Sequence, residues 1–211
     1  MMKFRALFFV MGLLFSAMAS RAAEDVPPPA YNIDEILKTK DKNGHHAYRV
    51  ASVLWGELIM PPSNSGQIFR MPRPRPEATL LSAEKVVCHI CAFDCEMLSG
   101  FGVTIVDRDR RQEFLSALKA HEIIGDKEAV RILNDVKVAL EKKWSALRPG
   151  KGDFWTINLD DVSIEDSEAL GKAVDAFDGP FWKHQDTSIT YGKLLKYLKE
   201  NREQLLARKP R

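Results

Sequence analysis

Three cysteines have the most distinctive chemistry in this chain: Cys88, Cys91 and Cys95, in the pattern C-x2-C-x3-C. Thiolates at short spacings can hold zinc, together with a histidine such as His89 or with a more distant ligand. A pair of thiols can also form a disulfide, within the chain or between two chains. The third alternative is packing, because free cysteine is among the most buried residue types.

A single helix over residues 79–101 would hold all three cysteines. At about 100° per residue, it places Lys85, His89 and Glu96 on one polar stripe, opposite a broad apolar face. The cysteines share the border of these faces, since spacings of three and four residues return to one side of a helix. Asp94 falls within the apolar face, where an unpaired carboxylate is costly. We therefore expect Asp94 to accept hydrogen bonds from a neighbouring helix end or to be protonated.

The common catalytic motifs are absent from the sequence. It has no G-x-S-x-G nucleophile elbow, no glycine-rich phosphate loop and no dinucleotide-binding fingerprint. His121-Glu122 lacks the second histidine of a zinc protease helix, and we expect His121 at the edge of a core. An acid–base pair of Asp94 and His121 would require two helices to bring both side chains to one pocket. We predict a protein that is not an enzyme and that binds no cofactor.

An acidic segment lies in the second half of the chain, and its members are Asp160, Asp161, Glu165, Asp166 and Glu168. Such a cluster can bind a cation or a basic partner. It is also typical of a solvated loop that leads into a helix N-terminus, where negative charge is favourable. Ser163 precedes Asp166 by three residues, as in a capping box, so we expect a helix to begin there.

Residues 1–22 have the pattern of a secretory signal peptide. Lys3 and Arg5 precede an apolar run that is too short to span a bilayer comfortably, and small residues follow it. Removing this segment deletes Lys3, Arg5, Arg21 and no acidic residue, so the net charge changes from +2 to −1. We therefore expect a periplasmic or secreted protein without membrane attachment after cleavage. A nearly neutral chain lacks the basic face needed for non-specific nucleic-acid binding, which argues against a nucleic-acid partner.

The rest of the chain is predicted to form helices separated by breaks. Apolar residues at spacings of three and four predict helices over 47–58, 110–124, 127–148, 164–177 and 188–207, besides the one over 79–101 and a short one near 31–40. The proline- and arginine-rich residues 61–76 interrupt the first part, and Gly179-Pro180 is expected to turn the chain. We predict an all-α fold, a compact domain of about six helices over 78–207, preceded by an N-terminal extension over 23–77.

Four segments resemble successive blocks of the DNA-mimic-protein family, a helical bacterial domain of unknown function: EKVVCHICAFDCEMLSGF, EFLSALKAHEIIGDKEAVRIL, ALGKAVDAFDGPFW and LLKYLKENREQL. The shared features are a turn at Gly100-Phe101, a helix break at Ile124-Gly125 and a corner from Asp178 to Phe181. The resemblance covers about residues 80–206, and it implies an all-helical, non-enzymatic domain that tends to dimerise. The namesake occupies a DNA-binding protein with an acidic surface, whereas this chain is nearly neutral, so the resemblance implies protein binding in general.

We therefore predict an exported, non-enzymatic helical domain that binds another protein, as an inhibitor or an immunity-type factor does, and that could form a homodimer. The predicted partner surface comprises Phe181, Trp182, Asp160, Asp161 and Glu165. The alternative is a metal-binding or thiol-redox protein in which the three cysteines form the site.

Overall fold

The computed structural model describes residues 29–40, 45–59, 76–186 and 188–208. This part of the chain is all-α, as predicted, and no β-strand occurs in it. Its helices are α2 (Ile33–Leu37), α3 (His46–Leu58), α4 (Ser82–Glu96), α5 (Arg111–Ile123), α6 (Lys127–Leu147), α7 (Ile164–Val174), α8 (Asp178–Asp186), α9 (Ile189–Glu200) and α10 (Arg202–Leu205). A π-helix at Gly102–Asp107 leads from α4 towards α5.

The described residues contain more helices than the six or so predicted. The helix predicted over 188–207 is interrupted at Asn201, so that α9 and α10 are separate. Gly179-Pro180, expected to turn the chain, instead lies in the first turn of α8. Proline is accepted there because the first amides of a helix have no partner within the helix.

No helix in the described residues is both long and apolar enough to cross a membrane. The predicted signal peptide, residues 1–22, lies outside the described residues, as does segment 61–76 except for its last residue.

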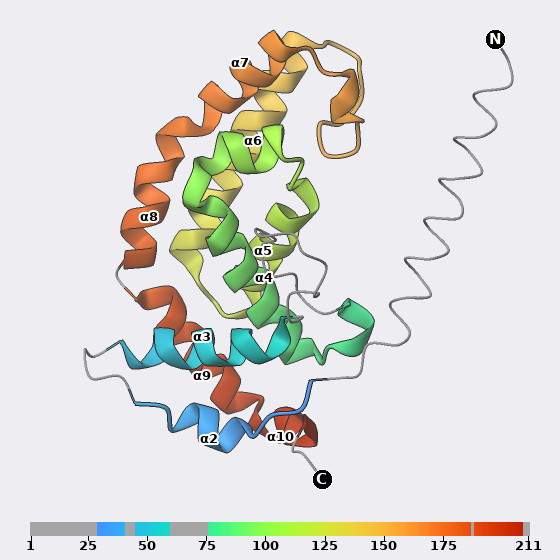
Figure 1. Cartoon of the computed structure of the whole chain (residues 1–211). Coiled ribbons are helices and arrows are strands. Elements are labelled where there is room, and N and C mark those ends of the chain that lie inside the picture. Colours follow the sequence, from blue (N-terminus) through green and yellow to red (C-terminus); the bar gives the residue numbers. More distant parts are fainter. Residues whose placement is uncertain (1–28, 41–44, 60–75, 187, 209–211) are drawn as a thin grey trace, which may run out of the picture.

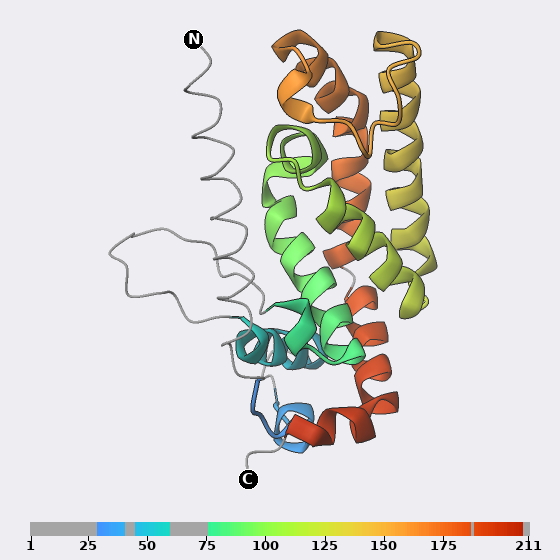
Figure 2. The same ribbon diagram turned by 90° about the vertical axis from the view of Figure 1, so that its right-hand side faces the viewer.

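Two hydrophobic clusters form the core, and α4 contributes to both. The lower cluster joins the first half of α4 mainly to α2, α3, α9 and α10. The upper cluster joins the second half of α4 to α5, α6, α7 and α8. In Figures 1 and 2, α3 crosses the lower end of α4, and α2 and α10 lie beneath it. The N-terminal helices therefore pack against the same core helix as the C-terminal ones.

The first turn of α4 is held by Glu84, which has no exposed surface. The Leu81 amide donates to Glu84 Oε2 at 2.6 Å, as in a capping box. The Tyr31 hydroxyl donates to Glu84 Oε1 at 2.8 Å, and Arg208 Nη2 donates to Oε2 at 2.7 Å. One buried carboxylate thus connects α4 with residues from near both ends of the described chain.

Gly100-Phe101, which follows α4, and Asp178, the first residue of α8, lie together at the edge of the upper cluster. The Phe101 amide donates to Asp178 Oδ1 at 2.9 Å, and the rings of Phe101 and Phe181 are 5.3 Å apart. Phe181 has no exposed surface and also packs against Phe93. Phe181 therefore belongs to the core and not to the predicted partner surface, because a fully buried ring cannot contact a partner.

Candidate functional site

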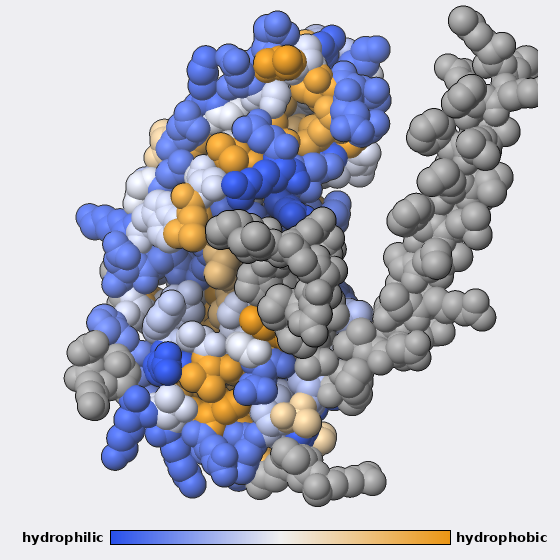
Figure 3. Space-filling model, viewed as in Figure 1, coloured by the Kyte–Doolittle hydropathy of each residue, from blue (hydrophilic) through white to orange (hydrophobic). Residues whose placement is uncertain are grey.

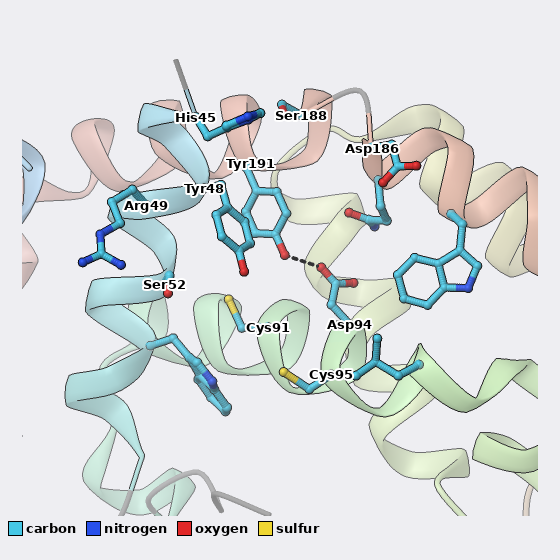
Figure 4. A pocket seen from close by; sticks show the side chains of 14 residues that line it. His45, Tyr48, Arg49, Ser52, Cys91, Asp94, Cys95, Asp186, Ser188 and Tyr191 are labelled. Carbon is cyan, nitrogen blue, oxygen red and sulfur yellow. Dashed lines mark hydrogen bonds between the residues drawn. The ribbon is translucent and has the colours of Figure 1, made fainter. Parts of the chain in front are cut away.

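An open pocket of about 680 Å³ lies where α3, α4, α8 and α9 meet (Figure 4). Four aromatic side chains line it: Tyr48 and Trp55 from α3, Trp182 from α8 and Tyr191 from α9. The rings of Tyr48 and Tyr191 meet edge to face, with centroids 5.0 Å apart. The pocket therefore exists only because α3 packs against the helices of the C-terminal part.

Asp94 lines this pocket from α4, and its carboxyl group is hydrogen-bonded on one side only. The Tyr191 hydroxyl donates to Asp94 Oδ2 at 2.7 Å, drawn as the dashed line in Figure 4. Asp94 Oδ1 is buried and has no hydrogen-bond partner among the described residues. Burial raises the pKa of Asp94 to about 6, against the lowering effects of His121 and Tyr191. The bond expected from the sequence is present, but a side-chain hydroxyl supplies it instead of a helix end.

Gln185 lines the same pocket from α8 and is only 8% exposed. Neither its amide oxygen nor its amide nitrogen has a hydrogen-bond partner within the described part of the chain. A buried polar group without a partner costs about 1–3 kcal/mol, and native proteins contain few of them. The pocket thus holds hydrogen-bonding capacity that the described residues do not use.

A separate polar cluster is centred on Asp126, which has no exposed surface and lies at the turn between α5 and α6. The Thr190 hydroxyl donates to Asp126 Oδ2 at 2.5 Å, and His184 Nε2 lies 3.0 Å from Oδ1. Lys193 Nζ approaches to 3.4 Å and His121 Nδ1 to 3.5 Å. Burial raises the pKa of Asp126, but its contacts with His121, Thr190 and His184 outweigh burial and hold the pKa well below the usual value. Asp126 occupies the N-cap position of α6, but its side chain makes no cap hydrogen bond and instead fixes α8 and α9 to the α5–α6 turn.

His121 is buried more deeply than the core-edge position predicted for it. It has no exposed surface, and neither ring nitrogen has a hydrogen-bond partner in the described residues. Its electrostatic effect lowers the pKa of Asp94, which lies on α4. A side chain without exposed surface cannot contact a substrate, however, and the pair forms no acid–base site open to the pocket.

The three cysteines do not converge on one site. Cys88 and Cys91 are 3% and 6% exposed in the lower cluster, whereas Cys95 is exposed and lines the pocket with Cys91. No group of three or more His, Cys, Asp or Glu side chains in the described residues could hold a metal ion, so the metal site predicted at these cysteines is not formed. Burial raises the pKa of each thiol, to about 12 for Cys88. A reactive thiol needs a lowered pKa, so packing describes Cys88 and Cys91 best.

The other predicted partner residues lie in two different places. Asp160, Asp161 and Glu165 are exposed around the start of α7, which lies at the top of Figure 1. Trp182 is half-buried and lines the pocket beside α3 and α9. The fold thus separates the acidic segment from the aromatic residue that was grouped with it.

Comparison with protein-family models, with curated proteins and with solved structures found no match.

Proposed function

We propose that this chain is an exported, non-enzymatic helical domain that binds another protein, in the manner of an inhibitor or immunity-type factor. The pocket between α3, α4, α8 and α9 is where the partner is held. The observation that carries the proposal is an open aromatic pocket bordered by exposed apolar residues: Leu98 is 78% exposed and Tyr48 is 50% exposed. Tyr and Trp are enriched at protein interfaces, where they fill concave sites on the partner or form them.

The character of the molecular surface favours a small, concentrated contact. Among the described residues on the face drawn in Figure 3, hydrophobic residues form separate patches surrounded by hydrophilic ones. Broad interfaces of permanent complexes are more continuously apolar than this. A partner that inserts one or two side chains into the pocket fits such a surface.

A photo-reactive amino acid in place of Leu98 tests the proposal in the cells that make the protein. We expect one dominant cross-linked product with a different chain, and we expect Trp182→Ala to reduce it strongly because a wall of the pocket is lost. The matched control is the same photo-reactive residue at Val138, which is 59% exposed on α6 and does not line the pocket. Equal cross-linking from both positions, or none from either, would contradict binding at the pocket.

The acidic segment provides a second variant for the same experiment. Reversing the charges at Asp160, Asp161 and Glu165 leaves the pocket intact, since none of these residues lines it. We expect the cross-link from Leu98 to persist in this variant. Its loss would move the partner surface to the start of α7.

A further inference from the structure

The pocket between α3, α4, α8 and α9 combines aromatic side chains with buried polar atoms that lack hydrogen-bond partners in the described residues. Asp94 Oδ1 offers a lone acceptor, and the Gln185 amide offers an acceptor and a donor, with no use for any of these in the described residues. Both groups line the same pocket, as do Trp55, Trp182 and Tyr191. The two acceptors, Asp94 Oδ1 and the Gln185 amide oxygen, suit a ligand rich in hydrogen-bond donors.

The charges around the pocket favour a cation at its acidic side. Asp94 and Asp186 contribute carboxyl groups from α4 and α8. The basic lining residues are His45, just before α3, and Arg49 in α3, and Figure 4 shows Arg49 directed away from Asp94. An anionic ligand at Asp94 would meet a carboxyl group without a counter-charge, whereas a cationic ligand would be paired.

We propose that this pocket recognises a guanidinium group, supplied by an arginine side chain of the partner, a proposal that rests on the protein-binding function above. A guanidinium group is planar, carries five N–H donors and no acceptor, and binds aromatic ring faces as well as carboxylates. It can donate to Asp94 Oδ1 and to the Gln185 amide oxygen while stacking on a ring of Trp182 or Trp55. An ammonium group supplies charge, but it lacks the flat surface that aromatic walls accommodate.

Binding requires a small rearrangement of the pocket. The unpartnered atoms of Asp94 and Gln185 are shielded from water in this structure. Binding therefore requires side chains of the pocket to change their torsion angles, so that these atoms accept charge-assisted hydrogen bonds from the guanidinium group.

The test uses the purified protein and two small probes, N-acetyl-arginine methylamide and N-acetyl-citrulline methylamide, which has nearly the same shape and no charge. The tryptophan indole signals in NMR spectra report the site, because Trp55 and Trp182 line the pocket whereas Trp144 and Trp155 do not. We expect the arginine probe to shift the first pair alone, with a Kd of about 1 mM or tighter, and the citrulline probe to bind at least about tenfold more weakly.

Asp94→Asn provides the decisive variant, because it removes the charge and keeps an oxygen for Tyr191. We expect it to weaken the arginine probe about tenfold or more, whereas Asp135→Asn, the same charge change on α6, leaves binding unchanged. Equal binding of both probes, or no indole shift at concentrations on the order of tens of millimolar, would overturn the guanidinium assignment.

The two proposals fail in different ways. A cross-link from Leu98 without arginine binding would keep the protein partner and discard the guanidinium assignment. Arginine binding without a cross-link would keep guanidinium recognition, assign it to a free small molecule and discard the protein partner.

Discussion

The carboxyl group of Asp94 ties the candidate site to the pH dependence of folding. Its pKa is about 6 in the folded protein, against an ordinary value of 3.8. Because the folded-state value is raised, the stability linked to Asp94 is fully present below about pH 4 and is lost as the pH rises through about 6. At neutral pH the charged form of Asp94 therefore lowers the free energy of unfolding. Groups with such perturbed pKa values are common at functional sites.

Asp94→Asn should make the protein more stable at neutral pH. The shift in pKa of Asp94 corresponds to at most about 3 kcal/mol, since one pKa unit equals about 1.36 kcal/mol. We expect a gain on the order of 1–3 kcal/mol in the free energy of unfolding at about pH 8, and little gain at about pH 3. Urea denaturation at both pH values measures this. The same gain at both values would show that the Asp94 charge is not its source.

Asp126 affects the pH dependence of stability in the opposite direction, and it has a structural role. Its pKa is lowered in the folded protein, so its contribution to stability is present above the ordinary value and lost as the pH falls below it. We expect Asp126→Ala to lower the free energy of unfolding by about 3–5 kcal/mol, because it removes a buried acceptor shared by Thr190 and His184. Asp135→Ala, at a partly exposed site, is the control for thermal denaturation. A similar small loss in both variants would contradict this role.

Residue patterns revealed part of the candidate site. Asp94 could be singled out from sequence because a carboxylate on an apolar helical face needs a partner. Tyr191 and Gln185 could not be identified in this way, because each lies on a different helix from Asp94. The spacing of apolar residues in those helices places both residues only near a helix surface. His121 was placed at a core edge for the same reason, and only the packing of α5 shows it to be fully buried.

At the scale of elements, the end of α4 depends on Gly100. Its φ of +84° lies in the left-handed region, and a Cβ atom there would approach Asp178 Oδ2 to 2.5 Å. Asp178 cannot move away freely, since its other oxygen accepts the Phe101 amide. Asp178 therefore both accepts the Phe101 amide and leaves no room for a side chain at position 100.

Gly100→Ala should be more harmful than an alanine at another left-handed glycine. Gly125 has a φ of +70° and no atom within 4 Å of the added Cβ, so it isolates the backbone strain. We expect a loss of about 1 kcal/mol for Gly125→Ala and about 2–4 kcal/mol for Gly100→Ala, measured by urea denaturation. Equal losses would mean that the clash with Asp178 is relieved without cost.

The ion pair of Glu84 with Arg208 holds the N-terminal segment that leads into α2 against α4. The Tyr31 amide also donates to the Arg208 carbonyl oxygen at 3.0 Å, which connects the two ends of the described chain. We expect Arg208→Met to leave a buried carboxylate poorly compensated and to speed hydrogen exchange in α2 at least tenfold, without a change in α6. The double variant Glu84→Gln with Arg208→Met should restore part of the protection. Unchanged exchange in α2 would show that apolar packing alone holds this helix.

A helix is predicted accurately when the spacing of its apolar residues alone defines it, and less accurately when its ends depend on neighbouring elements. α6 was predicted well because Leu133, Val136 and Leu140 repeat on one face, and all three are buried. α8 was missed because Gly179-Pro180 usually marks a turn, and its role as a helix start depends on where α7 ends. Phe154 and Trp155 lie in turns and pack into the upper cluster, a placement that helical periodicity cannot predict.

At the scale of the whole molecule, α4 decides whether the chain behaves as one unit. The sequence suggested an extension over 23–77 and a domain over 78–207, since proline-rich residues separate them. In the structure α3 packs against α4 and α9, and the candidate pocket lies between these parts. If α4 couples the two clusters, a destabilising substitution in the lower cluster lowers the free energy of unfolding of both clusters by the same amount.

Leu54→Ala tests this coupling, because Leu54 is fully buried on α3 and belongs to the lower cluster. A buried leucine replaced by alanine costs about 2–5 kcal/mol. We expect urea denaturation to show one transition at a lower midpoint, whether it is followed by labelling of Cys88 in the lower cluster or by the Trp144 signal in the upper one. Leu140→Ala in the upper cluster is the matched variant and should shift both signals as well. Separate transitions in either variant would mean that α2 and α3 unfold independently, and the pocket would then open without unfolding of the rest.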